Sequence, residues 1–164
     1  MTLRDHIILG GAASAALYAF TELEVIWFFF ASVLIDIDHY LDFVYHTGLR
    51  DVSPTNMFSY HRTLQRWWHD PAFLNMEIFH TAEFLFIVIT LAMVLKSGIL
   101  LALFLGLIFH IALDMIFLVR HGIFNKRTNS IISYFIKKRR LTGDGHNPEK
   151  LYKMAVKIVS SSPG

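Results

Sequence analysis

Apolar residues gather into four long segments that are separated by shorter polar stretches. The segments cover roughly residues 6–20, 25–45, 78–95 and 98–119. Each is about long enough to cross a hydrocarbon core as an α-helix, because a span needs roughly 20 residues. Asp36, Asp38 and Asp42 interrupt the second segment, and Glu83 interrupts the third. The pattern predicts an all-α polytopic membrane protein with four transmembrane helices in a bundle; the alternative is a soluble bundle with an unusually apolar core.

The composition favours a membrane protein over a soluble domain. Hydrophobic residues make up 54% of the 164 residues, and the mean hydropathy is +0.46, both above the range of ordinary soluble domains. The chain has no cysteine, which excludes a disulfide framework, a thiolate metal site and a cysteine nucleophile. Nitrogen and oxygen ligands must therefore hold any metal ion.

Basic residues are concentrated toward the C-terminus, where ten of the fifteen Lys and Arg residues fall at or after Arg120. Cytoplasmic flanks of membrane helices collect Lys and Arg, so we expect a multi-pass protein of the inner (cell) membrane with both termini in the cytoplasm. Residues 1–122 then form the four-helix transmembrane domain, with a cytoplasmic loop at about 48–75. Residues 123–164 form a cytoplasmic basic tail with short amphipathic helices.

The terminal regions contain two further patterns. Arg4 precedes an apolar run that contains Ala13-Ser-Ala15, a pattern also seen in cleaved signal peptides, but a retained first helix fits the charge distribution better. In the tail, Ile131–Arg140 places aromatic and aliphatic residues beside four cations. Such a segment is typical of helices that lie on anionic membranes. We therefore expect membrane lipids as partners and no nucleic acid, because no recognition motif accompanies the basic residues.

Carboxylates and imidazoles lie inside the apolar segments, where ionisable residues are costly and usually mark function. The four-helix topology places them near the cytoplasmic ends of their helices, at one depth. Asp36 lies off the helix face shared by its acidic neighbours, which indicates either a supporting role or a local distortion of the helix. The converging residues are His6, Asp36, Asp38, His39, Asp42, His80, Glu83, His110 and Asp114.

This mixture of residues favours a metal site. Imidazole and carboxylate ligands suit zinc, manganese or iron, and His/Glu pairs on facing helices build such sites in bundles. A cation would also stabilise several carboxylates crowded at one depth. A single buried His or Asp is more often a structural residue, but convergence from several helices reverses that expectation. The remaining histidines are interpreted as surface residues, except that His61 with Arg62 is undecided; they are His46, His69, His121 and His146.

The motifs resemble those of the small bacterial and archaeal inner-membrane proteins known as membrane-bound metal-dependent hydrolases, some of them LexA-regulated. That family has an early His followed by Gly, matched by His6 and Gly10, and a D-x-D-H motif, matched by residues 36–39. Its H-x-x-x-D motif is matched by residues 110–114. The resemblance covers most of residues 1–120. The family also has an H-R-G-x-T-H-S motif at the start of the third helix. That motif is split here, because residues 61–63 are separated from His80. Ile35 replaces the proline that usually precedes D-x-D-H.

The resemblance and the residues together predict a membrane-bound metal-dependent hydrolase that acts on a phosphoester or an acylated lipid at the cytoplasmic leaflet. The expected metal, zinc with manganese and iron as alternatives, would activate water and polarise the substrate. Glu83 and Asp42 are the candidate catalytic carboxylates. The expected metal ligands are His6, Asp36, Asp38, His39, His80, His110 and Asp114. The alternative function is a metal or proton transporter, or a non-enzymatic membrane subunit with a buried structural metal or charge cluster.

Overall fold

The computed structural model describes residues 3–20 and 24–161, and the chain is mostly helical, as the hydrophobic pattern predicts. It divides into two compact units, each built from two separate stretches of chain. The first unit comprises Met1–Asp36 and Ile78–Phe124, and the second comprises Ile37–Glu77 and Asn125–Gly164.

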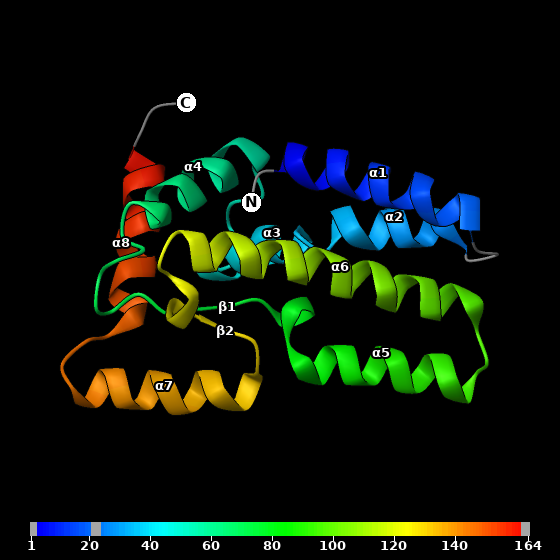
Figure 1. Cartoon of the computed structure of the whole chain (residues 1–164). Coiled ribbons are helices and arrows are strands. Elements are labelled where there is room, and N and C mark those ends of the chain that lie inside the picture. The colour runs from blue at the N-terminus through cyan, green and yellow to red at the C-terminus, as the bar shows by residue number, and fades with distance from the viewer. Residues whose placement is uncertain (1–2, 21–23, 162–164) are drawn as a thin grey trace. The chain divides into compact units, whose positions relative to one another are not determined.

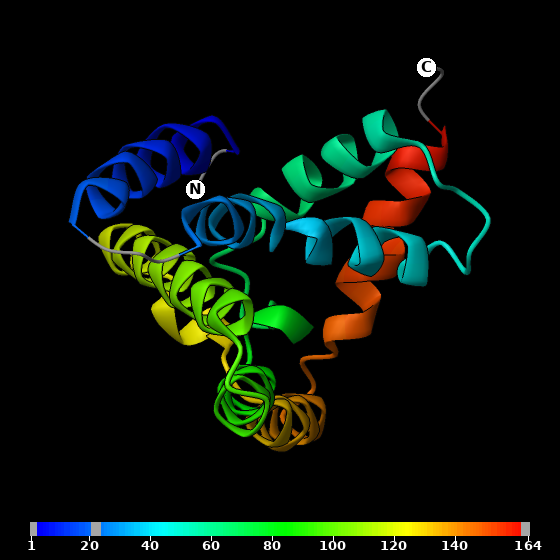
Figure 2. The same cartoon turned by 90° about the vertical axis from the view of Figure 1, so that its right-hand side faces the viewer.

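The first unit contains four α-helices among its described residues, and they run alongside one another (Figures 1 and 2). The central pair packs α2 against α6, with α1 against α2 and α5 against α6. Its apolar core is formed by Ala31, Ile35 and Leu107. The elements are α1 (Leu3–Phe20), α2 (Val25–Leu34), a short 3-10 helix (Ile78–His80), α5 (Ala82–Val94) and α6 (Gly98–Arg120).

Local sequence signals fix where α5 and α6 begin. The Thr81 hydroxyl accepts a hydrogen bond from the Phe84 amide, and the Ser97 hydroxyl accepts one from the Leu100 amide. Side-chain oxygens at this position satisfy amides that have no partner within the helix. The two caps therefore set the start of each helix.

The prediction of four transmembrane helices is wrong. Among the described residues, α6 alone, with 23 residues, is long and apolar enough to cross a membrane. The predicted second segment is divided into α2 and α3 (Ile37–His46), of 10 residues each, and the third yields only the 13 residues of α5. A helix rises about 1.5 Å per residue, so helices of 10 to 13 residues fall well short of a hydrocarbon core of about 30 Å.

The division between α2 and α3 coincides with the acidic residues of the predicted segment. α2 ends at Leu34, and α3 begins at Ile37 with Asp38 in its first turn. Carboxylates are favoured at and just before a helix N-terminus, where they interact with unpaired amides and with the helix dipole. The helix is interrupted at Ile35 and Asp36, and a local distortion was one of the two explanations for the off-face position of Asp36.

The second unit forms around an aromatic core. Phe43, Tyr60, Leu64, Phe73 and Tyr152 are all buried in it. A short parallel strand pair aligns Asn75 with Arg127 and Met76 with Thr128. The elements are α3, α4 (Pro54–Gln65), β1 (Asn75–Met76), β2 (Arg127–Thr128), α7 (Ile131–Gly143) and α8 (Pro148–Ser161), with a 3-10 helix (Phe124–Lys126) at the junction of the units.

Candidate metal centre

Two histidines and two aspartates from three helical segments of the first unit converge on one buried point. His6 comes from α1, Asp36 from the end of the α2 segment, and His110 and Asp114 from α6. The His6 Nε2 atom lies 3.2 Å from Asp114 Oδ1 and 3.9 Å from Asp36 Oδ2. The His110 Nε2 atom lies 3.3 Å from Asp36 Oδ1 and 3.6 Å from Asp114 Oδ2. Both imidazoles therefore direct a nitrogen at the same two carboxylates.

A backbone carbonyl near the end of α2 orients the His110 ring. The His110 Nδ1 atom lies 2.9 Å from the backbone carbonyl oxygen of Ser32, and this contact is buried. A carbonyl can only accept, so Nδ1 carries the proton and donates it. Ser32 belongs to the last turn of α2, where carbonyls have no partner within the helix. In the neutral ring, Nε2 then presents its lone pair to the cluster, which is the arrangement of a metal-binding histidine.

Close packing of α6 on α2 makes this contact possible. Gly106 is one turn before His110 on α6, and a Cβ atom at Gly106 would overlap the Phe28 carbonyl oxygen and lie 2.8 Å from the Ala31 Cβ. Only glycine allows the two backbones to approach this closely. The glycine therefore positions His110 against the carbonyl of Ser32.

His6 also satisfies the requirements of a ligand. Its side chain is fully buried, and within the described residues neither of its ring nitrogens makes a hydrogen bond of good geometry. Its ring stacks on that of His110, with centroids 3.8 Å apart and planes inclined by 11°. Two stacked imidazoles repel each other if both are charged, so a shared cation between their Nε2 atoms and the carboxylates is chemically favourable.

The donor spacing is compatible with one divalent ion. One donor atom from each of the four residues lies within 4.8 Å of all the others. Four ligands about 2.1 Å from a tetrahedral ion would be about 3.4 Å apart, so only small side-chain movements are needed. Asp36 is 19% exposed, whereas the other three side chains are nearly or fully buried. Solvent thus reaches the cluster on the Asp36 side, and these residues could hold a metal ion.

Two further predicted site residues belong to the first unit. The His80 Nε2 atom lies 3.9 Å from Asp114 Oδ2, and its ring meets that of His110 edge-on at a centroid distance of 5.1 Å. Glu83 lies half-buried in the first turn of α5 and is not a member of the four-residue group among the described residues. His80 thus lies at the edge of the cluster, and the catalytic role of Glu83 stays a prediction.

The remaining predicted site residues, Asp38, His39 and Asp42, lie on α3 in the second unit. Asp38 is buried. The His39 Nδ1 atom lies 3.3 Å from Glu77 Oε1, and Asp42 accepts a hydrogen bond of 3.2 Å from the Tyr60 hydroxyl. Burial, and then the charge of Asp42, raise the pKa of Tyr60 far above its ordinary value. These contacts give His39 and Asp42 structural partners on neighbouring elements of their own unit.

Sequence reasoning missed two features of the structure. The carbonyl of Ser32 has no side-chain signal, because any residue supplies a backbone acceptor. The ion pair of Glu77 with Arg127, buried beside the strand pair, was not predicted, because the two residues are far apart in the sequence and Arg127 belongs to the predicted basic tail. A lone Glu at the edge of an apolar segment was the available sequence signal.

Acidification is expected to destabilise the second unit through His61. Its Nε2–H donates a hydrogen bond of 2.7 Å to the His39 carbonyl oxygen, and burial together with the nearby His39 lowers the pKa of His61 to about 4. Above the unfolded pKa of about 6.5 both states are neutral. As the pH falls from 6.5 through 4, the unfolded chain takes up the proton first, and up to about 3 kcal/mol of stability is lost.

Thermal unfolding of the full chain, measured by tryptophan fluorescence between pH 7.5 and pH 4.5, checks this expectation. His61→Gln keeps a donor for the His39 carbonyl but cannot be charged, so its stability should fall less over this interval. His69→Gln replaces an exposed histidine of the same unit and should follow the wild type. Identical pH profiles for His61→Gln and wild type would contradict the assignment.

Comparison with models of known protein families, with curated proteins and with solved structures gave no match. The resemblance to the metal-dependent hydrolases therefore stays a prediction.

Proposed function

We propose that the first unit binds a divalent metal ion through His6, Asp36, His110 and Asp114, and that it hydrolyses a phosphoester or an acyl ester of a lipid at a membrane surface. The observation that carries the proposal is the convergence of two Nε2 atoms on the same two carboxylates. The contact of His110 Nδ1 with the Ser32 carbonyl supports it, because a neutral ring that donates from Nδ1 presents the lone pair of Nε2 to the cluster.

A bound divalent ion would supply two effects that ester hydrolysis needs, acidification of water toward neutral pH and polarisation of the substrate oxygen. The chain supplies the rest of the chemistry. Ser32 fixes the tautomer of His110, and burial of His6 and His110 keeps bulk water away from their rings. Asp36 is the most exposed of the four residues, so water and substrate would approach the ion from its side.

Apolar side chains exposed on the first unit support a membrane location. Phe86, Met93 and Val94 on α5 are 70–72% exposed, and α1, α2 and α6 also expose large apolar residues. Apolar surface of this extent is normally covered by a protein or a membrane. Combined with the length of α6, it favours a lipid bilayer as the surroundings of this unit and a lipid as the substrate.

A metal-dependent activity assay tests the proposal. The full chain is purified in mild detergent, stripped with EDTA and reloaded with zinc, manganese or iron(II). Hydrolysis is then followed on bis(p-nitrophenyl) phosphate and p-nitrophenyl butyrate, as reporters for the two ester classes. We expect turnover of one class that requires the metal and that falls at least about 100-fold in Asp114→Asn, which removes a ligand charge.

Lys153→Gln on α8, in the second unit, serves as the control and should retain full activity. Stoichiometric metal binding without hydrolysis of either reporter would contradict the enzymatic part of the proposal. Hydrolysis that persists in EDTA would contradict the role of the metal.

A further inference from the structure

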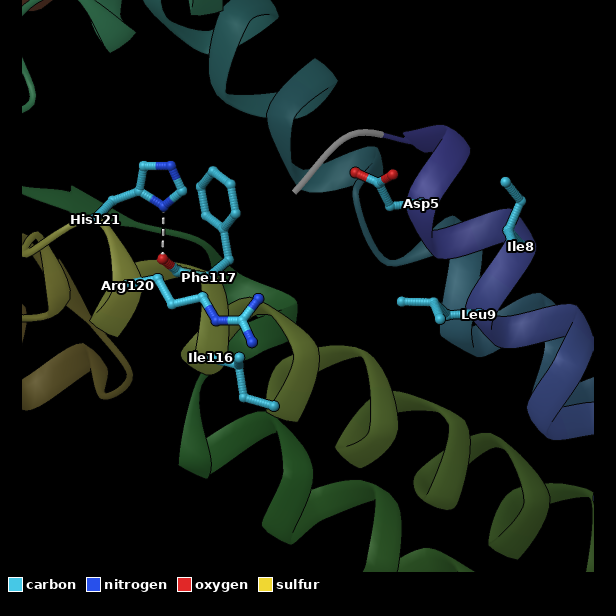
Figure 3. Close-up of a pocket in the computed structure, with 7 residues that line it drawn as sticks. All are labelled: Asp5, Ile8, Leu9, Ile116, Phe117, Arg120 and His121. Carbon is cyan, nitrogen blue, oxygen red and sulfur yellow. Dashed lines mark hydrogen bonds between the residues drawn. The ribbon is translucent and has the colours of Figure 1, made fainter.

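A pocket of about 390 Å³ lies between α1 and α6 in the first unit (Figure 3). Its volume is within the range of small-molecule sites. Four apolar side chains line it, namely Ile8, Leu9, Ile116 and Phe117. It adjoins the cluster along both helices, since Asp5 precedes His6 and Phe117 is one turn beyond Asp114.

The polar residues of the pocket carry opposite charges on opposite walls. Asp5 lies in the first turn of α1 and Arg120 in the last turn of α6. Figure 3 shows the Arg120 side chain extending toward α1, while the Asp5 carboxylate lies across the pocket. His121 lines the same end and donates a hydrogen bond of 2.8 Å from Nδ1 to the Phe117 carbonyl.

Each charge alone has a structural explanation, because acids near a helix N-terminus and bases near a C-terminus complement the helix dipole. The combination is more specific. A carboxylate from one helix and a guanidinium from the other line the same pocket as four apolar side chains, at the end of the one described helix that could cross a membrane. Guanidinium groups bind phosphate well, a carboxylate binds an ammonium group, and the apolar wall suits an acyl chain.

We infer that this pocket binds a zwitterionic phospholipid, with the phosphate at Arg120, the ammonium group at Asp5 and an acyl chain along Leu9 and Ile116. The pocket then selects the headgroup of the lipid. That this lipid is the substrate rests on the proposed function, whereas the binding itself requires no metal.

The experiment measures lipid binding in EDTA, so that failure of the metal proposal does not affect the result. Phosphatidylethanolamine and phosphatidylglycerol, each with a fluorophore on the acyl chain, are titrated into the full chain in mild detergent. We expect the ethanolamine lipid to bind about three- to fivefold more tightly, the size of one exposed ion pair. Asp5→Asn should abolish this preference, and Arg120→Gln should weaken binding of both lipids.

Matched controls are Asp144→Asn and Arg50→Gln, which replace exposed residues of the second unit and should leave both affinities unchanged. The inference would be overturned if the two lipids bound equally and neither Asp5→Asn nor Arg120→Gln changed the affinity. Competition by soluble phosphoethanolamine as effective as that by the lipid would also overturn it, because the pocket would then take a soluble compound. Loss of hydrolysis with lipid preference intact would refute only the proposed function.

Discussion

Replacing His110 with asparagine is expected to remove stoichiometric metal binding while leaving the fold intact. The asparagine amide can donate to the Ser32 carbonyl oxygen in place of Nδ1, but it has no atom at the position of Nε2. Loss of one of four ligands should weaken the affinity by at least about 100-fold, because even changes to supporting groups cost 10- to 100-fold. Isothermal titration of the EDTA-stripped chain with zinc or manganese measures the change.

The control is His146→Asn, which replaces an exposed histidine between α7 and α8 and should bind metal as the wild type does. Circular dichroism of both variants verifies that the helices are retained. Unchanged metal affinity in a folded His110→Asn variant would contradict the ligand assignment.

Substituting alanine for Gly106 should destabilise the first unit, although alanine is the better helix former by about 1 kcal/mol. The added Cβ atom overlaps the Phe28 carbonyl oxygen and approaches Ala31, and a backbone carbonyl cannot move aside as a flexible side chain can. Overpacking of this kind costs about 1 to 3 kcal/mol. We expect the Tm of the metal-free chain to fall by about 5 °C.

Gly98→Ala provides the matched control in the same helix. A Cβ atom at Gly98 would meet nothing within 4 Å, so this variant should be as stable as the wild type or slightly more stable. The Gly106→Ala variant should also bind metal more weakly, since pushing α2 away from α6 moves Ser32 relative to His110. A Tm for Gly106→Ala at or above that of Gly98→Ala would show that the two helices are not in close contact.

The helical character of the chain was predictable, whereas the lengths of its helices were not. Apolar periodicity identifies helices, but it does not show that the carboxylates of Asp36 and Asp38 favour the start of a new helix. The pattern therefore predicts one helix where the structure has α2 and α3. The pattern also predicts that the third helix begins at Ile78. In the structure the residues from Ile78 form a 3-10 turn, and Thr81 caps the helix that follows.

Part of the candidate site followed from spacing alone. His110 and Asp114 are four residues apart on one helix, and this periodicity places them on one face. The partnership of His6 with Asp36 depends on how α1 packs against α2 and on the interruption after Leu34, which no local pattern encodes. The expectation that all of the polar residues lie at one depth came from the four-span topology, which the helix lengths contradict.

X-ray absorption spectroscopy of the zinc-loaded full chain tests the proposed metal centre, because it identifies the ligands as well as the presence of the ion. We predict one ion per chain, bound by two imidazole nitrogens and by carboxylate oxygens at about 2.0–2.2 Å, and no stoichiometric zinc in His110→Asn. A well-folded chain that retains no zinc, or a zinc spectrum without imidazole scattering, would contradict it.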